Sequence, residues 1–468
     1  MRKVTIAAGT RITADAGAAI AALGGNAVDA AIAAAIVSLC TDTGIMSPGC
    51  GAFVNVWPAN GEPRVIDGYT EMPGRGLDRS NFVESTHEVS FDYGGETWQR
   101  VGYGSIATPG GFAGLALASR HFGRLPWAEL LQPAIDWIER GFPLTGGAAE
   151  YLGFTHAAIY SWHPDSYRIL HHQDGSPLSA GDLVRIPDLA DTLKTIARDP
   201  ASLYGGELGR HIADGVRANG GLLGSEDLRD YAAVERQPIR TRLGDWEVAT
   251  NPTPAVGGAC LAAMLSILDQ LGIGEDLQQY TRHMIDAQHA VLDYRARRLD
   301  GAREALPQVV EQLLEMARRA DSGLLSAPST SHVSAVDDDG LACAITASAG
   351  YGSGAMIEGT GFWLNNSLGE LDLHTRGLGG LAPGTRLASN MAPTIARRRG
   401  DGAVLAIGSP GASRITTAIA QVLANFAGGG MELAAAVEHP RLHVELAEHQ
   451  QTIAFEPGLP VEPRHGLN

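Results

Sequence analysis

The sequence predicts a chain of the α+β class, in which helices and strands are interleaved. Long apolar segments near the N-terminus have the length and composition of buried helices. A later stretch, residues 330–346, has the pattern of two strands joined by Asp339-Gly340. An Asp-Gly pair between two apolar runs is a strong signal for a hairpin. The length of 468 residues leaves room for two or three ordinary domains or for one large body.

Charge and hydropathy exclude several classes of partner. The formal net charge is −17, so the chain is repelled by phosphate backbones and by anionic membrane surfaces, and we expect no nucleic-acid or membrane partner. The longest apolar run, residues 30–40, is too short to cross a bilayer. The first ten residues lack the apolar core of a signal peptide, so we expect a cytoplasmic protein.

Metal, disulfide and nucleotide motifs are weak. The four cysteines are scattered, without the spacing of a metal site or of a disulfide framework, and a buried free thiol is the default for such residues. The chain has no Gly-x-Ser-x-Gly elbow, and its two lysines, Lys3 and Lys194, do not stand in a phosphate-binding loop. The pair His171-His172 lacks further ligands at metal spacing. We therefore expect neither a metal nor another cofactor.

The N-terminal third begins with two helices, at 13–23 and 26–40. Asn26 is a good N-cap, and Asp29 places a negative charge in the first turn, where the helix dipole favours it. The second helix is apolar on nearly every face and should be buried. A loop of small residues, 46–54, then runs into a strand. Its glycines favour tight strand packing over an approach of the backbone to substrate.

The middle of the chain is mainly helical. A helix opens near Pro126, a strand follows at 246–250, and further helices are expected at 259–271 and 281–298. Residues 299–329 are polar and helical at first, then small and loose. A last helix is expected at about 415–426.

Thr330 has two interpretations. In the simpler one, it ends a surface loop that enters the hairpin. In the other, the chain is cut before Thr330, and its freed α-amine, with a pKa near 8, serves as the base that activates the Thr330 hydroxyl. A strand that holds this terminus rigidly would fix the geometry of attack.

Short segments elsewhere in the chain favour the second interpretation. They are residues 24–31, 67–73, 102–114, 122–135, 348–354, 364–370, 387–395, 408–415 and 437–443, together with Thr330-Ser331-His332-Val333-Ser334. In sequence and in order they resemble signatures of the gamma-glutamyltransferase family of N-terminal nucleophile hydrolases. The resemblance covers nearly the whole chain.

The resemblance implies a fold and a maturation step. It implies the four-layer αββα sandwich of N-terminal nucleophile hydrolases, cut between Ser329 and Thr330. Residues 1–329 would be the large subunit, ending in a processing linker, and residues 330–468 the small subunit. The two fragments would stay associated as one structural domain, and a higher oligomer is compatible with the sequence.

The resemblance also implies roles for individual residues. Thr330 would be the nucleophile, and Ser348 stands where the family has a second hydroxyl that orients it. The turn at Gly411 and Ala412 matches the family's double glycine, whose backbone N–H groups form the oxyanion hole. Without the resemblance, Gly411 would be read as an N-terminal turn of the last helix.

The residues that would bind substrate depart from the family pattern. Ser389 and Asn390 match a Ser-Ser pair that contacts the substrate carboxylate. Gly350, Ser367 and Glu370 match an asparagine, a glutamine and an aspartate of the amino-group pocket. Thr70 stands where the family has a carboxylate-binding arginine, a role that threonine cannot fill; Arg75, five residues on, is a candidate substitute.

The sequence therefore predicts an N-terminal threonine hydrolase or acyltransferase. Its substrate would be a small amide, with water or an amine as acceptor and with altered acyl-group specificity. Members of the family that act on other substrates hydrolyse oxamate-type amides or acylated β-lactams, or cleave carbon–carbon bonds in secondary metabolism, and these activities remain alternatives. A further alternative is an unprocessed, inactive scaffold.

Overall fold

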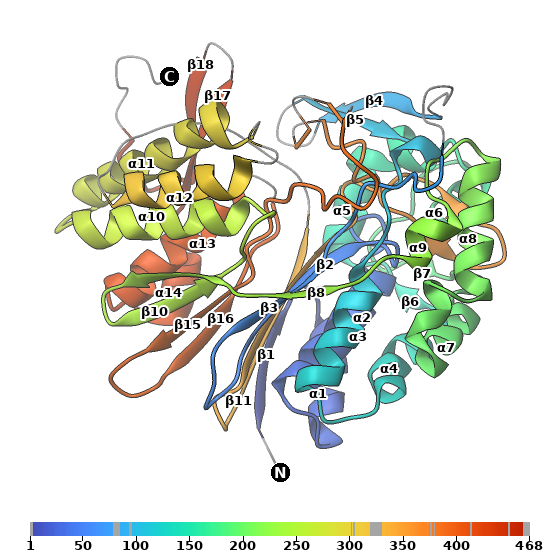
Figure 1. The fold of residues 1–468 in the computed structure, drawn as a ribbon, viewed down its shortest axis with the longest axis horizontal. Coiled ribbons are helices and arrows are strands. Elements are labelled where there is room, and N and C mark those ends of the chain that lie inside the picture. The colour runs from blue at the N-terminus through green and yellow to red at the C-terminus, as the bar shows by residue number, and fades with distance from the viewer. Residues whose placement is uncertain are drawn as a thin grey trace. The chain divides into compact units, whose positions relative to one another are not determined.

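The chain forms two compact units, each assembled from several stretches of sequence (Figure 1). The first unit consists of Met1–Val54, Ile66–Glu235 and Ser329–Leu387, and the second of Asn55–Val65, Arg236–Pro328 and Ala388–Asn468. Each unit thus contains chain from both sides of Thr330. The computed structural model describes residues 3–77, 85–92, 96–300, 302, 305–318, 330–371, 373–374, 377–378, 380–411, 414–447 and 450–461.

A six-stranded sheet contains the hairpin predicted from the sequence. β11 (Ser331–Asp337) pairs antiparallel with β1 (Val4–Ala8) on one side and with β12 (Ala342–Ser348) on the other. Gly340, in the β11–β12 turn, has a φ of +87°, which glycine adopts without strain. The hairpin prediction is confirmed, and β11 is an interior strand. The strand order is β1 (Val4–Ala8), β11 (Ser331–Asp337), β12 (Ala342–Ser348), β2 (Gly51–Trp57), β3 (Arg64–Gly68) and β8 (Val234–Arg236).

Helix α2 (Ala27–Thr41) is buried over its whole length, as its apolar composition predicts. The N-cap prediction is also confirmed. The Asn26 side chain accepts the backbone N–H of Asp29 at 3.0 Å, and the Asp29 carboxylate accepts that of Asn26 at 2.9 Å. α2 packs against β1, β11 and β12. It therefore supports the strand that begins directly after Thr330.

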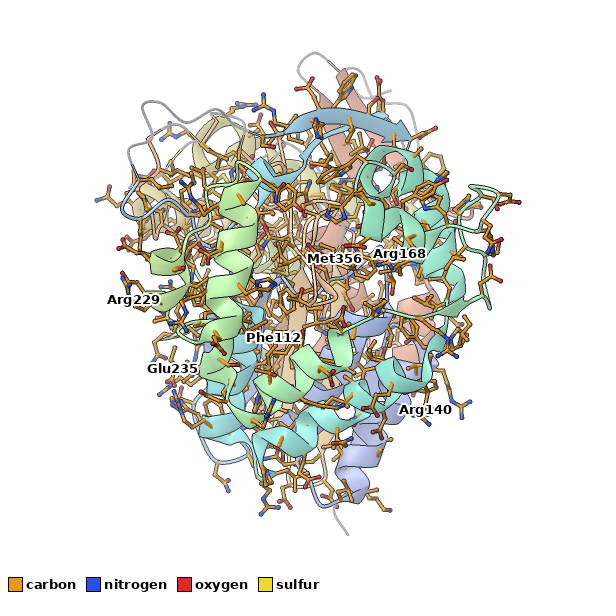
Figure 2. All side chains as sticks on the ribbon, turned by 90° about the vertical axis from the view of Figure 1, so that its right-hand side faces the viewer. Phe112, Arg140, Arg168, Arg229, Glu235 and Met356 are labelled. Atoms are coloured by element: carbon orange, nitrogen blue, oxygen red, sulfur yellow. The ribbon has the colours of Figure 1, made fainter. Side chains whose placement is uncertain are left out.

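The rest of the first unit is mainly helical. Figure 2 labels two of its buried side chains, Phe112 and Met356, and three exposed ones, Arg140, Arg168 and Arg229. Its other helices are α1 (Arg11–Ala22), α3 (Gly111–Phe122), α4 (Trp127–Arg140), α5 (Gly146–Thr155), α6 (Pro164–Leu170), α7 (Leu189–Arg198), α8 (Glu207–Ala218) and α9 (Ser225–Arg229). Its short strands are β4 (His87–Asp92), β5 (Glu96–Val101), β6 (Phe142–Pro143), β7 (Leu183–Val184), β13 (Met356–Ile357) and β14 (Phe362–Trp363).

The second unit is built on a four-stranded sheet and an apolar helix. The strand order is β16 (Val404–Ile407), β15 (Thr394–Arg398), β10 (Trp246–Thr250) and β9 (Ile239–Leu243). Helix α10 packs on β9 and β10 and against three further helices, α11, α12 and α13. The helices are α10 (Gly257–Leu271), α11 (Leu277–Tyr294), α12 (Leu306–Ala317), α13 (Arg414–Leu423) and α14 (Leu433–Glu438), and a hairpin is formed by β17 (Leu442–Ala447) and β18 (Gln450–Phe455).

The predicted helices and the strand at 246–250 are confirmed, with shifts of a few residues at their ends. The largest shift is in α11, which begins at Leu277 rather than at 281. The Asp276 side chain accepts the backbone N–H of Gln279 at 2.8 Å and so caps the helix earlier than the apolar pattern indicates.

The glycines of the 46–54 loop serve close packing. A Cβ added at Gly49 would lie 2.6 Å from the Trp363 carbonyl oxygen, and one added at Gly51 would lie 2.8 Å from the Thr70 backbone nitrogen. Both contacts are too short for any side chain. They support the interpretation that these glycines allow tight packing of the chain.

All four cysteines are buried free thiols, as expected. Burial raises the pKa of each thiol, to about 12 for Cys50 and Cys260. No helix within the described ranges is long and apolar enough to cross a membrane.

Candidate active site

Thr330 lies immediately before the first residue of β11 and is only 4% exposed. The β11–β12 register pairs Ser331 with Ala347 and continues to the pair Val336 and Ala342. In an antiparallel pair, one step back along β11 is one step forward along β12. Thr330 therefore stands opposite Ser348, the last residue of β12, which is also 4% exposed.

Alternate residues of β11 place polar groups on the sheet face that Thr330 shares. On this face, His332 Nδ1 lies 2.8 Å from Thr346 Oγ1, and His332 Nε2 lies 2.9 Å from Ser334 Oγ. Desolvation lowers the pKa of His332 to about 3, so the ring is neutral at physiological pH. With both nitrogens engaged, His332 fixes the side chains beside the start of β11.

Ser348 leads into a tight loop that contains Gly350. The backbone N–H of Gly350 donates to Ser348 Oγ at 3.1 Å. Gly350 has a φ of +61°, and a Cβ added there would lie 2.2 Å from Asn366 Oδ1 and 3.1 Å from the Glu370 carboxyl carbon. Asn366 Oδ1 accepts the N–H of Tyr351 at 2.7 Å, so it is held in place. Position 350 is thus closed to any side chain, and this requirement explains the glycine.

Ser367 and Glu370 lie in the same buried region. They are 1% and 2% exposed, and a Cβ at Gly350 would contact Glu370 directly. The Ser367 hydroxyl has no hydrogen-bond partner among the described atoms. The structure therefore brings Ser348, Gly350 and Glu370 together, with Ser367 on the adjoining segment.

Arg75 belongs to a cluster of charged residues around Glu71, and Thr70 directly precedes Glu71 in the sequence. Thr70 is fully buried, and its hydroxyl has no partner among the described atoms. The Arg75 guanidinium lies 3.1 Å from Glu71 Oε2 and 3.6 Å from Asp227 Oδ1. Arg75 is thus engaged by carboxylates of the same unit.

Arg386 is a further buried cation in this cluster, one that sequence reasoning missed. Its guanidinium lies 3.1 Å from Asp67 Oδ1, contacts Glu71 Oε1 and stacks 4.5 Å over the Tyr231 ring. Burial raises the pKa of Glu71, and the charges of Arg386 and Arg75 oppose that rise. No local motif marks Arg386, because its partners are more than 150 residues away in sequence.

Ser389 and Asn390 belong to the second unit. The Ser389 hydroxyl accepts the backbone N–H of Met391 at 3.2 Å, and the Ser389 carbonyl accepts that of Val256 at 2.9 Å. Asn390 is 4% exposed, and neither its amide oxygen nor its amide nitrogen has a partner among the described atoms. A Cβ at Gly257 would lie 2.0 Å from the Asn390 carbonyl oxygen, so the helix start of α10 is packed against this segment.

Gly411 lies three positions before the first residue of α13 in the second unit and has a φ of +108°. Its carbonyl accepts the N–H of Arg414 at 3.0 Å, which is the turn geometry that the sequence indicates. Its predicted partner Ala412 lies outside the described residues, as does Ser329 on the N-terminal side of the predicted cut.

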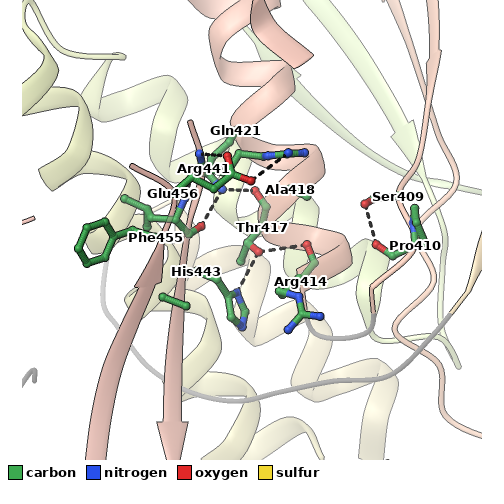
Figure 3. A pocket seen from close by; sticks show the side chains of 12 residues that line it. Ser409, Pro410, Arg414, Thr417, Ala418, Gln421, Arg441, His443, Phe455 and Glu456 are labelled. Atoms are coloured by element: carbon green, nitrogen blue, oxygen red, sulfur yellow. Dashed lines mark hydrogen bonds and ion pairs between the residues drawn. The ribbon is translucent and has the colours of Figure 1, made fainter. Parts of the chain in front are cut away.

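A cavity of about 390 Å³ lies beside this turn, within the second unit (Figure 3). Thr417 Oγ1 lies 3.0 Å from His443 Nδ1, and burial lowers the pKa of His443 to about 3, so the ring is uncharged. Arg441 pairs with Glu456 at 3.1 Å. The cavity is lined by Ser409, Pro410, Arg414, Thr417, Ala418, Gln421, Arg441, Leu442, His443, Ala454, Phe455 and Glu456.

Metal-binding geometry is absent from the part of the chain that the structure describes. No group of three or more His, Cys, Asp or Glu side chains converges there. His171, one of the pair considered from the sequence, instead contacts the His156 ring nitrogen at 3.0 Å.

A family model described as gamma-glutamyltranspeptidase matches residues 13–468 of the chain. The chain belongs to this family. The predicted gamma-glutamyltransferase identity and enzyme class are therefore confirmed: the chain is an amidohydrolase or transpeptidase of the gamma-glutamyltranspeptidase family.

Individual relatives include two named enzymes. Over 460 aligned residues the chain is 32% identical to the Acylase ACY 1 proenzyme of Pseudomonas sp. (strain SE83), which covers 92% of this chain and 80% of that relative. It is 30% identical to the glutathione hydrolase proenzyme of Pseudomonas aeruginosa, over 94% of this chain and 82% of the relative.

The fold is shared with a cephalosporin acylase from Bacillus halodurans. That crystal structure superposes with a TM-score of 0.76 at 24% identity, covering 98% of this chain and 86% of the other. The prediction of an N-terminal nucleophile hydrolase fold is thus confirmed.

Proposed function

We propose that this member of the gamma-glutamyltranspeptidase family cuts its own chain between Ser329 and Thr330 and then uses Thr330 as an amide-cleaving nucleophile. The observation that carries the proposal is the position of Thr330, buried at the start of the interior strand β11 and opposite Ser348. A chain end held in this way is positioned for attack. The names of two relatives, both proenzymes, support the maturation step.

The proposed reaction has two stages. The Thr330 α-amine takes the hydroxyl proton, Oγ forms a bond to the amide carbonyl carbon, and the C–N bond breaks as the amine leaves with that proton. Water or a second amine then attacks the ester, and Thr330 regains its proton. Ser348 orients the nucleophile. By the family pattern, backbone N–H groups at positions 411 and 412 would stabilise the oxyanion, a role that commonly supplies roughly 3 kcal/mol.

The maturation step is tested by mass spectrometry and N-terminal sequencing of the purified protein. We expect two fragments, one of which begins at Thr330, and a single intact chain for Thr330→Ala. We expect Thr330→Ser to be cut, because it keeps a hydroxyl on the same carbon. An intact wild-type chain with full activity, or unchanged activity in Thr330→Ala, would overturn the proposal in favour of a silent scaffold.

We further propose that the acyl group is not γ-glutamyl. Three features support this: Thr70 offers no charge for a carboxylate, Arg75 is engaged by Glu71 and Asp227, and position 350 has no room for a side chain. A site without partners for a polar group loses that ligand by orders of magnitude. The relation to an enzyme named as an acylase agrees with a different acyl group.

Specificity is tested with three p-nitroanilides that differ in one group each. The γ-glutamyl compound has an amine and a carboxylate, the 4-aminobutyryl compound only the amine, and the glutaryl compound only the carboxylate. We expect kcat/KM for γ-glutamyl to be no higher than for 4-aminobutyryl, because the carboxylate gains no cation. A γ-glutamyl preference of about 100-fold or more, the size that a dedicated polar contact gives, would contradict the proposal.

A further inference from the structure

A chain of three side chains leads from the end of α2 to the first residue of β11. Ser331 Oγ lies 2.8 Å from Ser38 Oγ, and Ser38 Oγ in turn donates to Asp42 Oδ2 at 2.5 Å. Ser38 is 2% exposed and Asp42 5% exposed. Asp42 directly follows α2, and Ser331 directly follows Thr330. The predicted active-site roles do not use any of these three residues.

The carboxylate sets the direction of the hydrogen bonds. An ionised Asp42 can only accept, so Ser38 must donate its single proton to it. Ser38 Oγ then accepts the proton of Ser331. The second oxygen of Asp42 has no partner among the described atoms, so among them Ser38 is the donor that holds this carboxylate. The two hydrogen bonds therefore run in one direction: Ser331 donates to Ser38, and Ser38 donates to Asp42.

The Tyr160 hydroxyl links the loop after Asp42 to the segment that follows Ser348. The Tyr160 hydroxyl donates to the Gly44 carbonyl at 2.8 Å and lies 3.4 Å from the Tyr351 carbonyl. Ser38 in α2 thus contacts the start of β11, and Tyr160 bridges the loop after α2 to the Gly350 loop; these two segments flank the Thr330–Ser348 pair.

We propose that Asp42 and Ser38 are positioning residues, which hold Ser331 so that Thr330 stays in place once it has become a chain end. The inference rests on the proposed function, because only a cut chain needs these hydrogen bonds to hold Thr330. Before the cut, Thr330 is held by peptide bonds on both sides. After it, a free terminus tends to fray, and a misplacement of about 1 Å can cost a hundredfold in rate.

Backbone hydrogen exchange of residues 331–335, read by mass spectrometry, tests the proposal without a known substrate. We expect Ser331→Ala to speed exchange at these amides by roughly tenfold in the cut protein, the upper range for one lost hydrogen bond. In the uncut Thr330→Ala background, the same substitution should leave exchange nearly unchanged. Equal acceleration in both backgrounds, or none in the cut protein, would overturn the proposal.

Matched variants separate this role from simple loss of structure. Ser38→Ala should behave like Ser331→Ala, whereas Ser331→Thr should restore protection because it keeps the hydroxyl. Thr41→Val is the control, since the Thr41 hydroxyl is buried on the same helix but donates to the Val37 carbonyl of that helix. Faster exchange at residues 331–335 in Thr41→Val, or in Ser331→Thr, would contradict the proposal.

The failure of the proposed function gives a different result. Cutting of the Thr330→Ala chain, or no cutting of the wild type, would refute the maturation step itself. Normal cutting of Ser331→Ala with unaltered exchange would refute only the positioning role. Where a p-nitroanilide is turned over, Ser331→Ala should lower kcat and leave KM unchanged.

Discussion

Arg386 neutralises two buried carboxylates of the first unit, those of Asp67 and Glu71. Its removal would take away the partner that both Asp67 and Glu71 share, while Arg75 would still lie beside Glu71. We expect Arg386→Met to lower the free energy of unfolding by about 3–5 kcal/mol, the usual cost of breaking a buried ion pair from one side. Urea unfolding in the uncut Thr330→Ala background measures this change on one covalent chain.

Arg11→Met is the matched control for this substitution. Arg11 pairs with Asp15 at 3.1 Å, but its side chain is 90% exposed, so the loss should be below about 1 kcal/mol. Equal losses in the two variants would show that the buried cluster adds nothing to stability.

Asp42 should make stability depend on pH. Burial raises its pKa from 3.8 to about 6, so the folded protein binds the proton more tightly than the unfolded chain. This group therefore lowers stability as pH rises from about 4 to 6, and its cost is complete above that window. The neighbouring thiols of Cys40 and Cys50 have raised pKa values and stay neutral there.

The test compares Asp42→Asn with its parent, both in the uncut background. Relative to the variant, the parent should gain about 3 kcal/mol in the free energy of unfolding as pH falls from 7 to 3.5, at about 1.4 kcal/mol per pKa unit. A difference between the two that does not change with pH would refute the raised pKa.

Sequence reasoning at the residue scale succeeded where partners are local. The Asn26 cap and the Asp339-Gly340 turn each depend on neighbours within a few residues. Arg386 and Asp42 were missed, because Ser38 and Ser331 are 293 positions apart and Asp67 and Arg386 are 319 apart. Thr330 was proposed as the nucleophile through resemblance, since its local pattern alone favours a surface loop.

At the scale of elements, the N-terminus of α2 is a junction between distant segments. The buried Asp29 carboxylate accepts the N–H groups of Asn26 at 2.9 Å and of Arg124 at 3.0 Å. Asp29→Asn puts an amide N–H₂ where an acceptor is needed. We expect a loss of about 1–3 kcal/mol in the free energy of unfolding, the cost of an unsatisfied buried donor.

Urea unfolding measures this loss, with Asp15→Asn on the exposed face of α1 as the control. That substitution should cost less than about 0.5 kcal/mol, as is usual for surface changes. A loss for Asp29→Asn no larger than for Asp15→Asn would mean that the capping network is not needed for stability.

The existence of the elements was predictable, but their ends and neighbours were less so. α11 starts four residues before its expected position because of the Asp276 cap. The pairing of β1 with β11 joins residues more than 300 positions apart, and no local pattern indicates it.

At the scale of the whole molecule, the pairing of β1 with β11 should keep the two fragments together after the proposed cut. β1 belongs to residues 1–329 and β11 to residues 330–468, and the two strands are joined over five residue pairs. We expect the fragments of the cut protein to elute together in gel filtration and to separate only in denaturant. Fragments that separate in native buffer would contradict the pairing or the maturation step.

The fold was predictable from resemblance rather than from periodicity. Apolar patterns predicted helices and a hairpin. No local pattern predicts that each unit combines chain from before Thr330 with chain from after it. The candidate substrate residues were proposed from their positions in the resemblance, whereas the crowding at Gly350 could be seen only with the surrounding side chains in place.

The four buried thiols can report local unfolding of the chain, because each becomes reactive only when it is exposed. A thiol reacts with an alkylating reagent only as the exposed thiolate, so the folded protein should be almost inert to iodoacetamide. Cys40, Cys50 and Cys343 belong to the first unit and Cys260 to the second. Peptide mapping after a short labelling pulse would therefore show which unit loosens first under stress, with no probe introduced.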